Sequence, residues 1–283
     1  MTYLRSVFIL CALLVCVPLH AEEPDLLKTF VEELVVITPG EGNFPKSFQM
    51  GSRIEGEQAE PVHEVTFDYS FSIAKYEVPQ NLYELVMEEN PSRWTGPRNS
   101  VEMMSPDEAR EFCEKLTGLL RARKLIAESE IIRLPSEAEW EYCCRAGTTT
   151  VYSFGNKAQA DEDLGKMASI LDDFAWHTGN AAGNDPPVGA LKPNPWGLYD
   201  MHGYLWEFVS DDGVAGFTDA PTDGSPRRTN DAKQAVLRGG SWKNRYDELT
   251  SSYRKMMKES VRDDAVGFRC VKSTPVPGGE TGQ

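Results

Sequence analysis

Apolar positions in the first quarter of the chain switch between helical and extended spacing. Residues 22–33 place charged side chains among leucine, phenylalanine and valine, which predicts a short amphipathic lead-in helix. Short strands are predicted at residues 34–38 and 48–50, separated by a proline-glycine turn and a polar insertion. Residues 62–76 alternate between apolar and polar side chains, which predicts one or two further strands.

Three helix starts are marked by the residues that open them. Pro79 begins a segment with leucines and a valine at helical spacing. Ser105 and Ser136 each begin a capping box, because a glutamate follows three residues later, and Pro106 stands in the first turn of the earlier helix. These caps predict where helices begin and carry no functional information.

The second half of the chain has a different character. Residues 148–241 are rich in Gly, Pro, Asn and Asp and have few periodic stretches. They nevertheless carry tryptophans, which disordered segments lack. We therefore expect irregular but ordered structure in a single domain over residues 34–273, followed by a flexible tail at residues 274–283.

The first 21 residues have the layout of a secretory signal peptide. Arg5 is the only charged residue before Glu22, an apolar run covers residues 7–17, and Ala21 supplies a small residue at a cleavage point. The run is shorter than the roughly 20 apolar residues that a membrane helix needs. We expect cleavage after residue 21, a secreted or periplasmic protein, and no membrane span.

The charge balance narrows the range of partners. The chain has 29 Lys and Arg against 44 Asp and Glu, a formal net charge of −15. A surface this acidic repels phosphate backbones, so nucleic acid is excluded as an expected partner.

Four cysteines lie outside the signal segment: Cys113, Cys143, Cys144 and Cys270. None belongs to a CxxC pair, and the histidines are too scattered for a zinc site. Export favours disulfides. Cys143 and Cys144 are neighbours on a predicted helix, where buried thiols, a strained bond between them or a crosslink to another chain are all open alternatives.

Nine short motifs follow one another in a fixed order. They are 49–52 (QMGS), 61–63 (PVH), 75–78 (KYEV), 90–92 (NPS), 132–142 (IRLPSEAEWEY), 193–201 (PNPWGLYDM), 205–208 (LWEF), 237–242 (LRGGSW) and 267–270 (GFRC). The ordered set resembles the formylglycine-generating enzyme or sulfatase-modifying factor family. The resemblance implies the irregular C-type-lectin-like fold of that family, an α+β domain with little regular secondary structure.

The resemblance implies a calcium site in the loop before and within the LWEF motif. Asp200, Gly203, Leu205 and Glu207 match positions that bind calcium in enzymes of the family. Two carboxylates and two backbone carbonyls are hard oxygen donors of the kind that calcium prefers. The alternative is that Asp200 caps a turn and Glu207 pairs with an arginine.

The copper centre of the family is where this chain departs from the pattern. Ser241 and Trp206 match residues that line the oxygen-binding pocket of the enzymes, although a tight turn and a core position also explain them. Active members carry two copper(I)-binding cysteines at positions that are Asn244 and Leu249 here. Neither side chain is a thiolate ligand, so we expect no copper.

The resemblance also pairs Cys113 with Cys270 in a disulfide that closes a long loop. Taken together, the sequence favours an exported family member that has lost copper-dependent cysteine oxidation and acts as a binding or structural module for a peptide or protein. One alternative is an oxygen-dependent, protein-modifying oxidoreductase. A third is calcium-dependent carbohydrate binding.

Overall fold

The computed structural model describes residues 25–183, 185–229 and 233–274. The expected signal peptide at residues 1–21 lies outside the described residues, as does the expected tail except for its first residue. Among the helices of the described part, none is long and apolar enough to cross a membrane.

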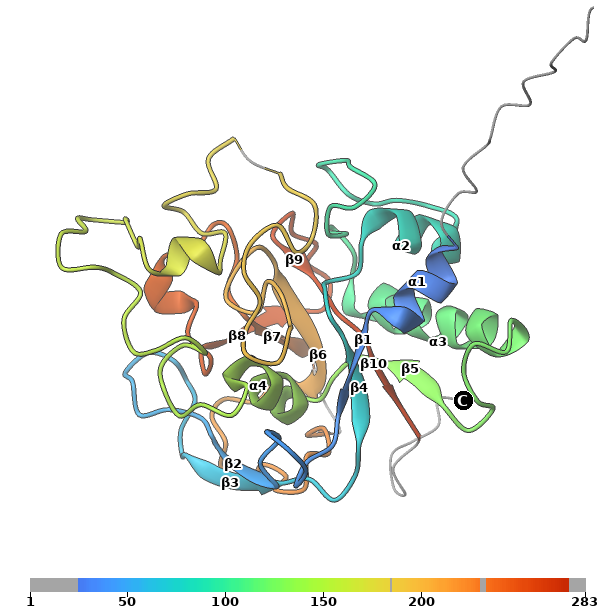
Figure 1. Ribbon diagram of the computed structural model, residues 1–283, viewed down its shortest axis with the longest axis horizontal. Coiled ribbons are helices and arrows are strands. Elements are labelled where there is room, and N and C mark those ends of the chain that lie inside the picture. Colours follow the sequence, from blue (N-terminus) through green and yellow to red (C-terminus); the bar gives the residue numbers. More distant parts are fainter. Residues whose placement is uncertain (1–24, 184, 230–232, 275–283) are drawn as a thin grey trace, which may run out of the picture.

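One antiparallel sheet joins the two ends of the domain. Its strands are β1 (Leu34–Ile37), β4 (Phe71–Ala74), β10 (Val271–Ser273) and β5 (Ile131–Arg133), in that spatial order. Three helices gather on one side of it (Figure 1): α1 (Leu26–Glu32), α2 (Gln80–Met87) and α3 (Pro106–Ala122). Apolar residues of these helices, including Leu82, Phe112 and Leu116, pack into one buried cluster with Phe268.

A second sheet contains most of the LWEF motif and the start of the LRGGSW motif. It runs in the order β8 (Arg254–Lys258), β7 (Gln234–Arg238), β6 (Trp206–Asp212) and β9 (Val266–Gly267), with β9 parallel to β6. A separate hairpin-like pair consists of β2 (Ser47–Met50) and β3 (His63–Thr66). Helix α4 (Glu137–Arg145) packs against β2, β6 and β7 (Figure 1). Two short 3-10 turns, η1 (Leu171–Asp173) and η2 (Tyr246–Glu248), complete the fold.

The predicted elements of the first half are confirmed. The lead-in helix is α1, the alternating segment at residues 62–76 contains β3 and β4, and all three marked helices form. Ser105 and Ser136 both close the capping boxes that their sequences indicate. As expected, the described residues of 148–241 are mostly irregular, and their regular elements are η1, β6 and β7. Five of the seven β6 residues are buried, four of them in succession from Trp206, so the strand lacks polar alternation.

Buried charges fix the strand that leads into Ser241. Arg238, which is 0% exposed, donates to Glu137 Oε1 at 3.1 Å and Glu141 Oε2 at 2.7 Å on α4. It also donates to the carbonyls of Ser251 and Ser252. Each terminal nitrogen of the guanidinium has one carboxylate and one carbonyl acceptor, while Nε has no partner among the described residues. The four bonds hold α4, β7 and the segment before β8 together.

Candidate functional site

A tight turn after β7 presents Ser241. Gly239 and Gly240 have φ values of 94° and 75°, which L side chains rarely adopt. A Cβ on Gly240 would lie 2.7 Å from Leu249 Cδ1 and 2.8 Å from the Glu248 carbonyl. The glycines are therefore required by both the turn and the close approach of the following segment.

Asn244 connects the turn to β6 by its side-chain amide. Its Oδ1 accepts hydrogen bonds from Ser241 Oγ at 2.6 Å, Ser241 N at 3.2 Å and Trp206 Nε1 at 2.9 Å. Its Nδ2 donates to Glu248 Oε2 at 3.0 Å. The structure thus brings Ser241, Trp206 and Asn244 together, with the amide orienting the other two side chains.

Leu249 is a core residue. It is 0% exposed and packs in an apolar cluster with Tyr152, Leu171 and Ala175. A side chain with no lone pair in such a site cannot ligate a metal. The chemistry of Asn244 and Leu249 therefore does not fit copper(I), and we derive no reaction step from that metal.

The thiol of Cys144 on α4 is connected to Leu249 through His202. Its Sγ lies 3.8 Å from His202, whose Nδ1 is 2.9 Å from the Leu249 carbonyl oxygen. Burial raises the pKa of Cys144 to about 12 and lowers the pKa of His202 to about 4, so both groups are neutral at physiological pH. Across residues 25–183, 185–229 and 233–274, no group of three or more His, Cys, Asp and Glu side chains is placed to hold a metal.

The predicted calcium positions lie around a buried ion pair. Both oxygens of Glu207 accept from Arg269 at 2.7 Å, and Glu207 Oε2 also accepts from Trp140 Nε1 at 2.8 Å. This is the arginine pairing considered as the alternative. Asp200 Oδ2 accepts from Gly189 N at 2.8 Å, whereas Asp200 Oδ1 is buried with no hydrogen-bond partner among the described residues.

A third carboxylate, Glu77, completes this buried acidic group. It is 0% exposed and accepts from Ser100 Oγ and, at 3.1 Å, from Leu205 N. Burial, together with the charges of Glu207 and Asp200, raises the pKa of Glu77 well above its usual range. Arg269 occupies both oxygens of Glu207, so of the two carboxylates predicted to bind calcium only Asp200 has an oxygen without a partner among the described residues, and the calcium site stays a prediction.

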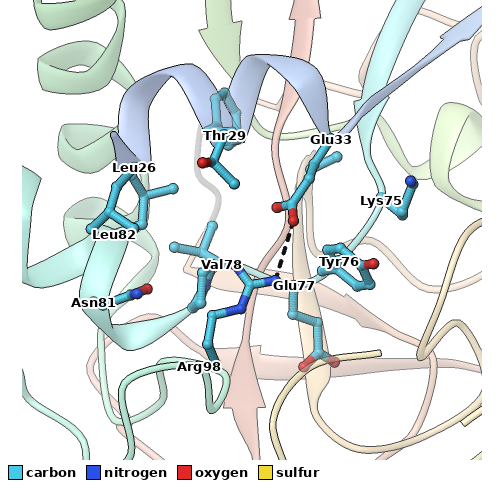
Figure 2. Close-up of a pocket in the computed structure, with 13 residues that line it drawn as sticks. Leu26, Thr29, Glu33, Lys75, Tyr76, Glu77, Val78, Asn81, Leu82 and Arg98 are labelled. Atoms are coloured by element: carbon cyan, nitrogen blue, oxygen red, sulfur yellow. Dashed lines mark hydrogen bonds and ion pairs between the residues drawn. The ribbon is translucent and has the colours of Figure 1, made fainter. Parts of the chain in front are cut away.

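Glu77 also borders a small cavity beneath α1. The cavity has a volume of about 20 Å³ and lies between α1 and the start of α2. Figure 2 shows Arg98 and Glu33 facing each other beside it, joined by an ion pair of 3.3 Å. This space admits about one water molecule, so it is not a site for an organic ligand.

A much larger pocket lies beside the Ser241 turn. Its volume is about 630 Å³. Trp242, the residue after Ser241, and Leu205, the residue before Trp206, both contribute to its lining. Six further lining residues carry aromatic or acidic side chains: Trp94, Glu102, Trp176, Asp185, Tyr204 and Asp264. Pockets of this size with apolar walls and a few polar groups are typical of ligand sites.

The sequence predictions missed Glu102 and Trp176. Glu102 is 3% exposed, and its Oε1 accepts from Arg93 N at 2.5 Å and Trp94 N at 2.9 Å. Ser92 of the NPS motif accepts from Glu102 N at 3.2 Å, so that motif serves to hold the glutamate. The only feature of the sequence that could have indicated Glu102 is its position as a single acidic residue between Val101 and two methionines.

The cysteines occupy buried positions. The sulfurs of Cys113 on α3 and Cys270 before β10 lie 3.8 Å apart. The two residues are neighbours, as the resemblance implies, and their disulfide stays a prediction. Cys143 and Cys144 are both 0% exposed on α4, so the described structure places these thiols in the core.

Comparison with family models identifies the family of the chain. Residues 22–274 match the family model described as the sulfatase-modifying factor enzyme 1-like domain. The formylglycine-generating enzyme of Mus musculus is 32% identical over 149 residues, covering 49% of this chain and 38% of that protein. The inactive C-alpha-formylglycine-generating enzyme 2 of Bos taurus is 30% identical over 162 residues, covering 52% of this chain and 46% of that protein. The chain spans less than half the length of both relatives.

A solved structure shows the same fold over most of both chains. PvdO from Pseudomonas aeruginosa superposes with a TM-score of 0.69 and is 27% identical, covering 84% of this chain and 93% of that one. This similarity confirms the α+β, C-type-lectin-like architecture that the motifs imply.

Proposed function

The chain belongs to the sulfatase-modifying factor enzyme 1-like family, and from that premise we propose that it is an exported binding module without copper-dependent cysteine oxidation. The observation that carries the proposal is the chemistry at two positions. Asn244 is committed to four hydrogen bonds inside the protein, and Leu249 is buried among apolar side chains. The bovine relative described as inactive supports the same interpretation.

The partner that we propose is an extended peptide or a protein segment. The pocket beside the Ser241 turn supplies space of about 630 Å³ next to the position of the lost thiolates. Trp94 is 47% exposed at this pocket, and Leu164 and Met167, which flank the lining residue Lys166, are 78% and 54% exposed. Exposed apolar side chains around a pocket are typical of surfaces that bind other proteins.

Copper binding tests the loss of oxidase chemistry. The wild-type protein, the N244C/L249C variant and the N244S/L249A variant are titrated with copper(I) without oxygen, in competition with a chromogenic chelator. The serine and alanine pair removes side-chain volume as the cysteine pair does but supplies no thiol. We expect tight, stoichiometric binding by N244C/L249C alone.

Turnover is measured on the same proteins. Each is mixed with copper, oxygen, a thiol reductant and a cysteine-containing peptide, and the peptide mass is followed for conversion of cysteine to formylglycine. Wild-type protein that binds copper and converts the peptide would overturn the proposal. If N244C/L249C keeps its fold by circular dichroism but does not bind copper, then the chain lacks more of the copper site than the two thiolates.

A further inference from the structure

Two side chains that line the large pocket each have a buried polar atom without a hydrogen-bond partner in the described part of the chain. Glu102 Oε2 is an acceptor, and Trp176 Nε1 is a donor. Glu102 is 3% exposed, and the N–H groups of Arg93 and Trp94 hold its other oxygen, Oε1. A buried polar group without a partner is unfavourable, so a ligand that supplies both partners gains affinity.

A hydroxyl is the ligand group that can serve either atom. It has one O–H donor and two acceptor lone pairs, so it can donate to Glu102 or accept from Trp176. An ammonium or guanidinium group serves only the glutamate, because it has no acceptor. An ionised carboxylate serves only the indole, because it has no donor. A ligand with several hydroxyls therefore matches both residues better than an ionic ligand does.

The walls of the pocket are aromatic. Four rings contribute to them: Trp94, Trp176, Tyr204 and Trp242. The negative face of an aromatic ring attracts the C–H groups of a saturated ring, and a sugar combines such a C–H face with hydroxyls at its edge. A peptide backbone also has donors and acceptors but lacks this flat face. Cations of the chain already lie near two of the indoles, Arg93 at 5.1 Å from Trp94 and Lys243 at 5.1 Å from Trp242.

The charges around the pocket disfavour an acidic sugar. Its lining contains three acidic side chains and two lysines: Glu102, Asp185, Asp264, Lys166 and Lys243. Lys243 is already engaged by Asp263 and Asp264, at 2.7 Å from Asp263. Beyond the pocket, a net charge of −15 repels anions over distances near the Debye length.

We propose that the interior of this pocket binds an uncharged saccharide, with Glu102 accepting from one hydroxyl and Trp176 donating to another. The sugar ring packs against the aromatic walls, and these contacts need no calcium. In this respect the proposal differs from the calcium-dependent carbohydrate binding considered for the sequence. It goes beyond the proposed function, because it assigns a second class of ligand to the interior of a pocket whose exposed apolar rim is proposed to bind a peptide.

Four soluble trisaccharides test the proposal on the full mature chain, in buffer that contains EDTA. Cellotriose and triacetylchitotriose are uncharged, triglucosamine is cationic, and trigalacturonate is anionic. Binding is measured by calorimetry. A change in tryptophan fluorescence on binding reports contact with the indole walls.

Two variants and a matched control assign the effect. W176F keeps an aromatic ring but loses the N–H donor. E102Q keeps an oxygen for the two backbone N–H groups but replaces the free acceptor by an amide donor. E64Q removes one charge from an exposed position on β3 and is the control. Circular dichroism shows which variants fold, and either W176F or E102Q alone is sufficient for the test.

We expect at least one uncharged trisaccharide to bind wild-type protein and E64Q equally. W176F should bind it about three- to tenfold more weakly, and E102Q about tenfold more weakly, because the bond to the carboxylate is charge-assisted. Trigalacturonate should bind at least about tenfold more weakly than the uncharged trisaccharide.

Four results would overturn the proposal. The first is that no trisaccharide binds, and the second is that triglucosamine alone binds, which would show selection for charge instead of hydroxyls. The third is unchanged affinity in folded W176F and E102Q, which would place the sugar elsewhere on the protein. The fourth is binding that appears only after calcium replaces EDTA, which would favour the metal-dependent alternative.

Discussion

Replacing Asn244 by alanine should lower the free energy of unfolding substantially, because the Asn244 side chain holds the turn after β7 to β6. The substitution removes the acceptor for Ser241 Oγ, Ser241 N and Trp206 Nε1. A net contribution of about 0.5–1.5 kcal/mol for each of the three bonds gives a loss of about 1.5–4.5 kcal/mol in the free energy of unfolding. The substitution also removes the hydrogen bond that Asn244 Nδ2 donates to Glu248, but solvent water can replace this donor.

Urea unfolding followed by tryptophan fluorescence measures this loss, with thermal melting as a second readout. For a domain of this size we expect the Tm to fall by roughly 5–10 °C. N156A is the matched control, since Asn156 Oδ1 accepts one exposed bond from Val151 N at 3.1 Å. That variant should lose at most about 1 kcal/mol.

The measured loss decides whether Asn244 is a structural anchor at the position where active family members carry a copper ligand. If N244A loses less than about 0.5 kcal/mol, the amide does not hold Ser241 and Trp206, and the reasoning that this position has become a structural anchor is refuted. A loss equal to that of N156A would lead to the same conclusion. A loss near 3 kcal/mol with an unchanged fold would support the amide as the anchor.

Three further results are expected. If calcium binds at Asp200, a chelator should lower the Tm and D200A should remove that effect, whereas a melt indifferent to chelator contradicts the calcium prediction. Thiol counting on unreduced, denatured mature protein should find two reactive groups if Cys113 and Cys270 are bonded, and four would exclude the bond. Burial raises the pKa of Glu102 from 4.5 to about 7, so the free energy of unfolding should fall as the pH rises between these values, because the folded state binds that proton more tightly than the unfolded chain does. Urea unfolding at several pH values should show this dependence reduced in E102Q, and identical profiles for E102Q and wild-type protein would contradict it.

The elements that could be predicted from the sequence have local causes. The side chains of Ser105 and Ser136 each accept a hydrogen bond from the backbone N–H three residues ahead, so a four-residue segment determines where the helix begins. β6 has no such local mark. It is buried along most of its length, shifts register between Phe208 and Asp212, and pairs with segments that are distant in sequence. Its strand character therefore depends on tertiary contacts.

Some residues of the candidate site could likewise be predicted from the sequence, and others could not. Asn244 and Leu249 could be identified because they stand at fixed sequence positions after Ser241 of the LRGGSW motif. Glu102 and Trp176 could not, since they reach one pocket from segments more than 70 residues apart. Arg269 falls between these cases: the alternative of an arginine partner for Glu207 was anticipated, but which arginine supplies it depends on the parallel pairing of β9 with β6.

The retention of Ser241 and Trp206 without the thiolates has a physical explanation in these contacts. A metal bound by two thiolates would tie residue 244 to residue 249, and its loss leaves the turn without that tie. Here the amide of Asn244 binds the serine and the tryptophan, while Leu249 anchors the other end by burial against Gly203 and Gly240. Under the proposed function, hydrogen bonding and apolar packing take the place of a metal bond at these two positions. The turn can therefore keep its shape, and the pocket beside it can stay open to a partner, without copper chemistry.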